Sequence, residues 1–95
     1  MPLALTMAAG EDFYVGDDRF EVEEVFLTEG FTLRGPDGVL HSVDAKKSVD
    51  IAPEVRVSDG HRVLVGKARI VFNAPRSVPI LRGQLYREQR PDAAE

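Results

Sequence analysis

Side chains suited to acid–base chemistry or metal binding are sparse in this chain of 95 residues. His41 and His61 are the only histidines, they lie twenty residues apart, and there is no cysteine. A zinc site or a catalytic dyad needs several such groups together, so we expect neither histidine to bind a metal or to act in catalysis. The lack of cysteine also excludes disulfides and thiol nucleophiles.

Carboxylates are plentiful, but their spacing matches no ion-binding motif. The run from Asp17 to Glu24 contains five acidic residues without the spacing of a calcium loop, and it is interpreted as a solvated strand face. Residues 35–38 (Gly-Pro-Asp-Gly) are interpreted as a tight turn, because the Lys and Ser or Thr of a phosphate-binding loop do not follow. The sequence therefore predicts no catalytic residue, no metal site and no cofactor, and a protein that is not an enzyme.

The basic residues give a clearer signal because they are unevenly distributed. Residues 1–60 hold 13 acidic and 5 basic residues, net −8, whereas residues 61–95 hold 3 acidic and 7 basic residues, net +4. The total of −4 argues against nonspecific binding to polyanions, which depends on many contacts between cations and phosphates. An anion site is therefore expected in the last third of the chain.

The elements expected to position these residues are β-strands. Apolar and polar side chains alternate over short segments that are separated by Gly, Pro, Asp and Asn, which is typical of a meandering antiparallel sheet. A helix is predicted over 82–90, a segment without β-branched residues that is followed by Pro91. The predicted strands are 3–8, 12–15, 19–27, 31–34, 38–43, 48–51, 54–58, 61–66, 68–73 and 77–81.

The length predicts one small domain, residues 1–90, followed by a flexible tail at 91–95. A core this thin would gain from pairing with a second copy. One of the adjacent Phe13 and Tyr14 must face outward from its strand and offers a possible stacking surface. Four phenylalanines are expected in the core: Phe20, Phe26, Phe31 and Phe72.

The location of the protein is predicted from what the chain lacks. No stretch approaches the roughly 20 apolar residues of a membrane helix. The apolar start is not flanked by basic residues as a secretory signal is. A cytoplasmic bacterial protein without a membrane partner is expected.

Two blocks at opposite ends of the chain carry a more specific pattern. The first is L-x-L-T-x-x-x-G-E-x-x-x-V-G-D over residues 3–17, and the second is A-R-I-V-F-N-A-P-R-S-V-P-I-L-R-G-Q-L-Y over residues 68–86. Both are similar, in the same order, to motifs of the carbon storage regulator family (CsrA/RsmA) of bacterial post-transcriptional regulators. The chain resembles an atypical member, with family-like blocks 1–26 and 62–90 and an insertion, about 27–61, between the family's strands two and three.

The resemblance implies both a fold and a function. The fold is all-β with a short C-terminal helix, an intertwined, strand-exchanged antiparallel β-sheet homodimer to which the insertion adds a β-rich segment. In this fold the first and last strands of each chain pair with the middle strands of the other. The family binds GGA elements in hairpin loops of mRNA or small regulatory RNA and represses translation or alters mRNA stability. Unpaired bases in a loop can be read at their edges by a strand with free backbone groups.

Eight residues of this chain match positions that line the RNA site of the family. Arg82 corresponds to the arginine that is central to RNA binding, and its planar guanidinium suits phosphates and guanine edges. A solvated arginine at the start of the helix is the alternative. Arg69, on a central strand, is expected to pair with a carboxylate rather than with RNA. The eight residues are Leu5, Thr6, Ala74, Pro75, Arg76, Val78, Ile80 and Arg82.

The chain departs from the family pattern within both blocks. Met7 and Ala8 stand where two arginines follow the L-x-L-T motif, so the first strand lacks two cations. Losing two contacts of roughly 1 to 3 kcal/mol each would weaken RNA binding by orders of magnitude. Gly83 replaces a glutamate that begins the helix, and this weakens the start of the helix. The candidates to replace the missing cations are Lys46, Lys47 and Arg56 of the insertion.

These departures favour an alternative function. A degenerate member of the family would not bind RNA itself, and would instead bind a protein partner or a paralogue through its acidic insertion, residues 27–61. The net negative charge of the chain agrees with this interpretation.

Overall fold

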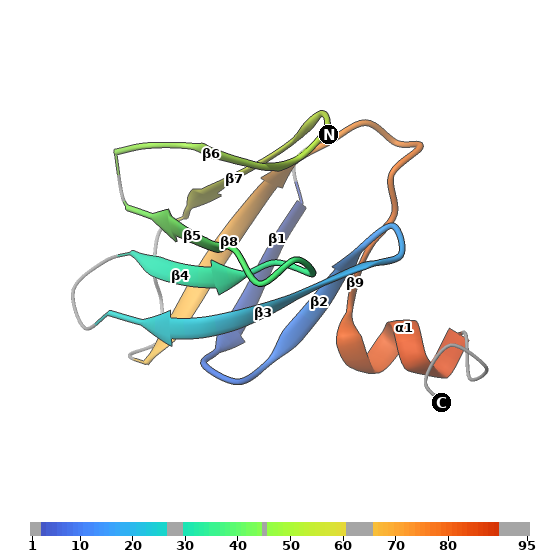
Figure 1. Ribbon diagram of the computed structural model, residues 1–95, viewed down its shortest axis with the longest axis horizontal. Coiled ribbons are helices and arrows are strands. Elements are labelled where there is room, and N and C mark those ends of the chain that lie inside the picture. Colours follow the sequence, from blue (N-terminus) through green and yellow to red (C-terminus); the bar gives the residue numbers. More distant parts are fainter. Residues whose placement is uncertain (1–2, 27–29, 45, 61–65, 90–95) are drawn as a thin grey trace.

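The architecture is antiparallel β-sheet with one short C-terminal helix, which confirms the predicted all-β class (Figure 1). The structure, a computed structural model, describes residues 3–26, 30–44, 46–60 and 66–89. The elements are β1 (Leu3–Ala8), β2 (Asp12–Val15), β3 (Asp18–Val25), β4 (Phe31–Arg34), β5 (Leu40–Val43), β6 (Val49–Ala52), β7 (Val55–Asp59), β8 (Lys67–Asn73), β9 (Ile80–Arg82) and α1 (Gly83–Gln89).

Two sheets pack face to face around a common core. One has four strands in the order β1-β8-β7-β6, and the other has five in the order β5-β4-β3-β2-β9. Figure 1 shows the strands of the two sheets crossing obliquely, with α1 beside β2 and β9. The strands β4 to β7 all lie within residues 27–61, the segment predicted to be an insertion, and this segment contributes two strands to each sheet.

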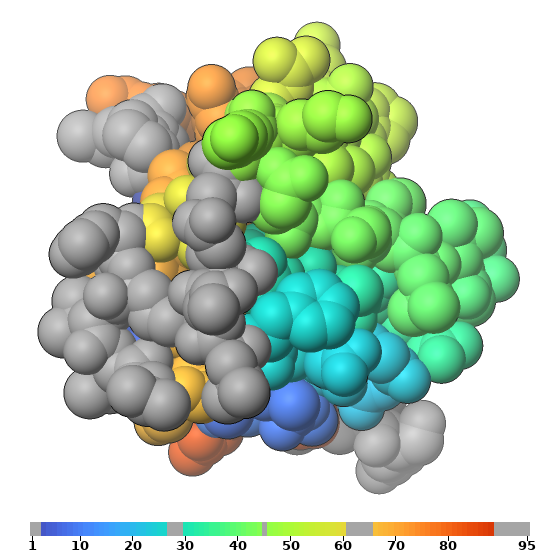
Figure 2. Space-filling view, turned by 90° about the vertical axis from the view of Figure 1, so that its left-hand side faces the viewer, coloured from blue at the N-terminus to red at the C-terminus, as the bar shows by residue number. Residues whose placement is uncertain are grey.

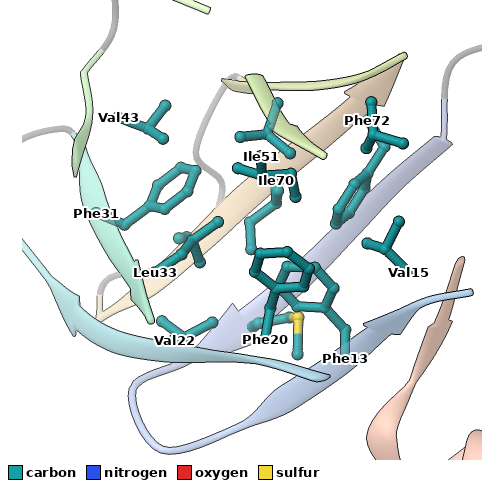
Figure 3. Packing of buried hydrophobic residues seen from close by; sticks show 14 residues of the cluster. Phe13, Val15, Phe20, Val22, Phe31, Leu33, Val43, Ile51, Ile70 and Phe72 are labelled. Carbon is teal, nitrogen blue, oxygen red and sulfur yellow. The ribbon is translucent and has the colours of Figure 1, made fainter. Parts of the chain in front are cut away.

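Aromatic side chains of both sheets meet in the core (Figure 3). Phe13 of β2 stacks on Phe20 of β3 with ring centroids 5.5 Å apart, and it meets Phe72 of β8 edge-on at 5.0 Å. Burying a side chain of this size stabilises the fold by about 1.5–3 kcal/mol. The predicted burial of Phe20, Phe31 and Phe72 is confirmed.

The prediction that Phe26 fills the core is wrong, since 39% of this residue is exposed. The pairing of β3 with β4 shifts register between Val22 and Glu24, as at a β-bulge. An extra residue at a bulge reverses the alternation of the strand beyond it. Val25 therefore packs against the core, and Phe26 faces outward.

Most predicted element positions are confirmed within two residues. The strands at 3–8, 12–15 and 31–34 have the bounds that were predicted. The last strand is shorter than expected and begins only after Pro79, which has no N–H to donate to a ladder. The strand predicted at 61–66 lies outside the described residues except for Gly66, which is in a turn, and the tail 91–95 lies outside them entirely.

The first strand pairs with the next-to-last strand, and the last strand pairs with the second strand, all within the same chain. β1 pairs with β8, which places Thr6 opposite Arg69 and Ala8 opposite Lys67, and β9 pairs with β2. One chain thus completes both sheets by itself. The exchange of these strands between two chains stays a prediction.

Candidate nucleic-acid interface

β1 and β9 are edge strands of different sheets, and they lie next to each other without forming a ladder. The Nη1 atom of Arg82 donates a hydrogen bond to the carbonyl oxygen of Thr6 at 3.0 Å. At the other end of the two strands, Leu3 and Ile80 line the same groove. β1 and β9 therefore run in the same direction along a shared margin. We call this margin, made of β1, the connection 74–79 and β9, the β1–β9 seam.

All eight residues predicted for the RNA site belong to the β1–β9 seam. Four of them, Leu5, Ala74, Val78 and Ile80, also pack against the core, and Leu5 pairs with the buried Ile70 and supports the seam from inside. At one end of the seam is an apolar groove of about 130 Å³. It is lined by Leu3, Phe72, Ala74, Pro75, Arg76, Val78 and Ile80.

A polar groove of about 260 Å³ lies at the Arg82 end of the seam. Arg82 and Arg87 line it together with Glu11 and Asp12. The carboxylate of Asp12 accepts hydrogen bonds from Arg19 at 2.8 Å and from Arg87 at 2.9 Å. Asp12 is therefore paired with Arg19 and Arg87 and not with Arg82.

The pKa values of this cluster agree with that arrangement. Burial raises the pKa of Asp12, but the hydrogen bonds and charges of Arg87 and Arg19 outweigh it, so the pKa lies below the usual 3.8. The hydrogen bond with Asp12 also raises the pKa of each arginine. All three groups are thus charged at neutral pH.

The glycine at position 83 is explained by Asp12. A Cβ atom added at Gly83 would collide with the carboxylate of Asp12. The negative charge at the start of α1 is therefore supplied by β2, where the resemblance led us to expect a glutamate within the helix.

The orientation of α1 is set by two tyrosines. Tyr86 is stacked on Tyr14 with ring centroids 3.7 Å apart, and its hydroxyl donates to Asp17 at 3.1 Å. Phe13 is the buried member of the adjacent aromatic pair, as alternation requires, and Tyr14 is covered by the helix. Tyr14 is thus not the open stacking surface that its outward position suggested.

The arginines of the described residues fall into two groups. No carboxylate pairs with Arg69, Arg76 or Arg82 in the described part of the chain. Arg82 is half-buried and gives one of its five N–H donors to Thr6, which leaves the others for a ligand. Ion pairs with carboxylates are formed by Arg19, Arg34, Arg56 and Arg87.

The peptide groups of Thr6 face the seam. The carbonyl of Arg69 accepts a hydrogen bond from the Gly60 N–H at 2.8 Å, on the β7 side of β8. Thr6 and Arg69 are therefore a non-hydrogen-bonded pair of the antiparallel ladder, in which the backbone groups of Thr6 point away from β8. Its carbonyl binds Arg82, and its N–H is likewise directed away from β8, toward the seam.

The insertion does not supply the missing cations as predicted. Lys46 and Lys47 follow β5, which is at the opposite edge of its sheet from β9. Arg56 binds Asp50 at 2.9 Å. That prediction is wrong because the insertion builds the far side of both sheets.

Sequence reasoning missed two cations on β8. Lys67 and Arg69 are exposed and lie opposite Ala8 and Thr6. The expectation that Arg69 pairs with a carboxylate is wrong for the described residues. An antiparallel alignment of the two family-like blocks would have found both cations, because it sets each first-strand residue against a partner on β8.

No protein-family model, curated protein or solved structure matches this chain. The resemblance to carbon storage regulators therefore rests on the motif residues themselves. In the described residues, no group of three or more acidic or histidine side chains could hold a metal ion, and no helix is long and apolar enough to cross a membrane.

Proposed function

We propose that this protein is an RNA-binding post-transcriptional regulator. It holds a GGA-type segment, displayed in the hairpin loop of an mRNA or small regulatory RNA, in the β1–β9 seam. By covering such elements it represses translation or alters mRNA stability in the bacterial cytoplasm. The observation that carries the proposal is the guanidinium of Arg82, which is half-buried, fixed by the Thr6 carbonyl and without a carboxylate in the described part of the chain.

Each end of the seam suits a different part of a single-stranded RNA. The free donors of Arg82 match the O6 and N7 acceptors of guanine or a phosphate. The Thr6 N–H adds a fixed donor for a base edge that is splayed out of its stack. The apolar groove between Leu3 and Ile80 offers contact area for an unstacked base, and the exposed Arg76 at its rim suits a phosphate.

A strand-exchanged homodimer is the assembly that the resemblance implies. Exchange would form the pairings β1–β8 and β2–β9 between two chains, with the same residues in register. The seam is complete in either form. Light scattering at known concentration distinguishes them, because the closed chain has a mass of 10.5 kDa and the exchanged pair has about twice that mass.

The proposal is tested by RNA binding to an Arg82→Ala variant. A hairpin with GGA in its loop should bind the natural chain, and Arg82→Ala should lose about 5- to 150-fold in affinity, equivalent to about 1–3 kcal/mol. Arg34→Ala is the matched control, because Arg34 is bound to Glu23 on the opposite part of the same sheet. Failure of the natural chain to bind the hairpin at low salt would overturn the proposal.

A second candidate function is protein binding through the insertion. Val39 and Leu40, at the hairpin between β4 and β5, are 50% and 53% exposed. In Figure 2 the insertion, coloured cyan to yellow, forms a broad surface on the side of the molecule away from α1. Val39→Ser/Leu40→Ser should then abolish co-purification of a protein partner from the native host. Tight RNA binding without any such partner would count against this function.

A further inference from the structure

The outer face of the β1–β8 pair carries two cations that the seam does not contain. Lys67 and Arg69 project from β8 on this face, opposite Ala8 and Thr6 of β1. Their neighbours Ala68 and Ile70 point the other way into the core, as alternation along a strand requires.

Thr6 connects this face with the seam. It pairs with Arg69 across the ladder and binds Arg82 through its carbonyl, so it lies between two arginines that belong to different sheets. Side chains of a non-hydrogen-bonded pair approach closely, with Cβ atoms about 4.5–5.5 Å apart. Arg82, Thr6 and Arg69 therefore form a row that runs across the strands.

Arg69 is supported in this position by Gly60. A Cβ atom added at Gly60 would approach the Cγ and Cδ atoms of Arg69 to 3.1 Å, so the aliphatic part of the arginine lies across the glycine. The guanidinium is thus presented at the surface by a packed stem. Neither Arg69 nor Lys67 pairs with a carboxylate in the described part of the chain, in a protein with 16 acidic residues.

The side chains of β1 leave the outer face open to a ligand that crosses it. Met7 is fully buried opposite Ala68 and borders the polar groove beside Arg82, so a side chain at position 7 points toward that groove and not onto the outer face. Ala8 is small and lies beside Lys67, which leaves the surface above it to the lysine. The cations on the first-strand side of the site therefore come from β8.

We propose that Lys67 and Arg69 bind the backbone phosphates of the RNA where it leaves the seam. A strand whose base is held at Arg82 passes over Thr6 and continues across β8. This inference rests on the proposed function, since it concerns the path of the same RNA. It predicts that the two parts of the binding surface contact different parts of the RNA. The seam contacts the bases of GGA, and Lys67 and Arg69 contact the backbone only of an RNA long enough to reach β8.

The test compares two RNAs and two variants by fluorescence anisotropy. The short RNA has about four nucleotides around GGA, and the long RNA has the same GGA within about twelve nucleotides. Lys67→Ala/Arg69→Ala removes the β8 cations, and Lys46→Ala/Lys47→Ala is the matched control that removes two charges from the far edge of the other sheet. Thermal unfolding by circular dichroism checks that both variants are folded.

The β8 variant should lose about 10- to 30-fold in affinity for the long RNA and little for the short one. The slope of log K against log salt should fall by about 1.4 for two phosphate contacts with a single strand, and only for the long RNA. The control variant should bind both RNAs as the natural chain does.

Other outcomes separate this inference from the proposed function. If Arg82→Ala abolishes binding and the β8 variant behaves as the control, the proposed function stands and the path over β8 is overturned. If the β8 variant loses binding and Arg82→Ala does not, the outer face is supported and the seam is overturned. If the natural chain binds neither RNA at low salt, both are overturned.

Discussion

The two sheets approach each other at two margins that differ in how they are closed. At one margin, β5 contacts β6 and β7 directly. At the other, β1 and β9 are joined by the side chain of Arg82 and have a groove at each end. The first margin is made by residues 27–61, the segment predicted to be an insertion, and the second by the two blocks that resemble the family.

The margins differ in charge as well. Arg56 at the end of the sheet near β6 is bound to Asp50, whereas Arg76 and Arg82 at the β1–β9 seam have no carboxylate in the described part of the chain. A surface arginine in an acidic protein is expected to find a carboxylate, and the gain from such a pair is small, about 0–1 kcal/mol. The unpaired Arg76 and Arg82 at this margin therefore indicate, better than the net charge does, where an anionic ligand would bind.

The largest change in the free energy of unfolding is expected from a charge placed inside the seam. Met7→Arg puts a cation at a fully buried position and should lower the free energy of unfolding by about 3 kcal/mol. Ala8→Arg, one residue further on the outer face, should change it by less than about 0.5 kcal/mol. Urea denaturation measures both. Equal effects would contradict the alternation of β1.

A smaller change in the free energy of unfolding is expected from a substitution where β2 meets the start of α1. Gly83→Ala should lower the free energy of unfolding by about 1–2 kcal/mol, because the new methyl group displaces the Asp12 carboxylate from its arginines. Gln84→Ala, at an exposed position of the same helix, is the control. In a double-mutant cycle, Gly83→Ala should cost much less when Asp12→Ala is already present. Full additivity would contradict the contact.

A still smaller effect is expected at the rim of the apolar groove. Arg76→Ala should weaken binding of a GGA hairpin by about fivefold, equivalent to about 1 kcal/mol for one phosphate contact. Arg56→Ala, whose arginine is engaged with Asp50, should leave the affinity unchanged. Electrophoretic mobility shifts of the two variants at one salt concentration compare the two regions directly. If Arg76→Ala and Arg56→Ala lost the same affinity, the position of an arginine at the seam would not matter for RNA binding.

The smallest effect concerns acid stability. The folded-state pKa of Asp12 is lowered, so the stability it contributes is complete above its unfolded pKa of about 3.9 and is lost as the pH falls through the lower folded value. Asp12→Asn should therefore flatten the fall in Tm below about pH 4.

The control for acid stability is Glu23→Gln. The pKa of Glu23 is lowered by its hydrogen bond with Arg34, but this pair is exposed and its charges are screened by solvent. The substitution should change the Tm profile less than Asp12→Asn does. A larger change from Glu23→Gln would contradict the importance of the Asp12 cluster.

The sequence predicted strands well where a single alternation of apolar and polar residues ran from turn to turn. β1, β2 and β4 have the predicted bounds for this reason. Phe26 was misplaced because a bulge in β3 changes the face of later residues without altering the composition of the strand. The number of strands in each sheet and the division of the insertion between both sheets depend on packing, which no local pattern records.

The part of the candidate site that could be predicted from the sequence consists of motif residues on the edge strands β1 and β9. Thr6 and Arg82, both predicted to line one site, are joined by a hydrogen bond within a single chain, and their binding of RNA stays a prediction. The role of Gly83 could not be predicted, because it depends on a carboxylate from a distant strand. The cations of β8 were overlooked because their partners on β1 are fixed by register and not by closeness in sequence.

The seam joins residues that lie 76 positions apart, Thr6 near the start of the chain and Arg82 near its end. Such distant strands meet late in folding, because the entropy of closing a long loop must be offset before their contacts stabilise the fold. The seam can form only after β9 has been synthesised. A chain truncated before β8 would leave β1 without its partner strand and the edge of the first sheet open.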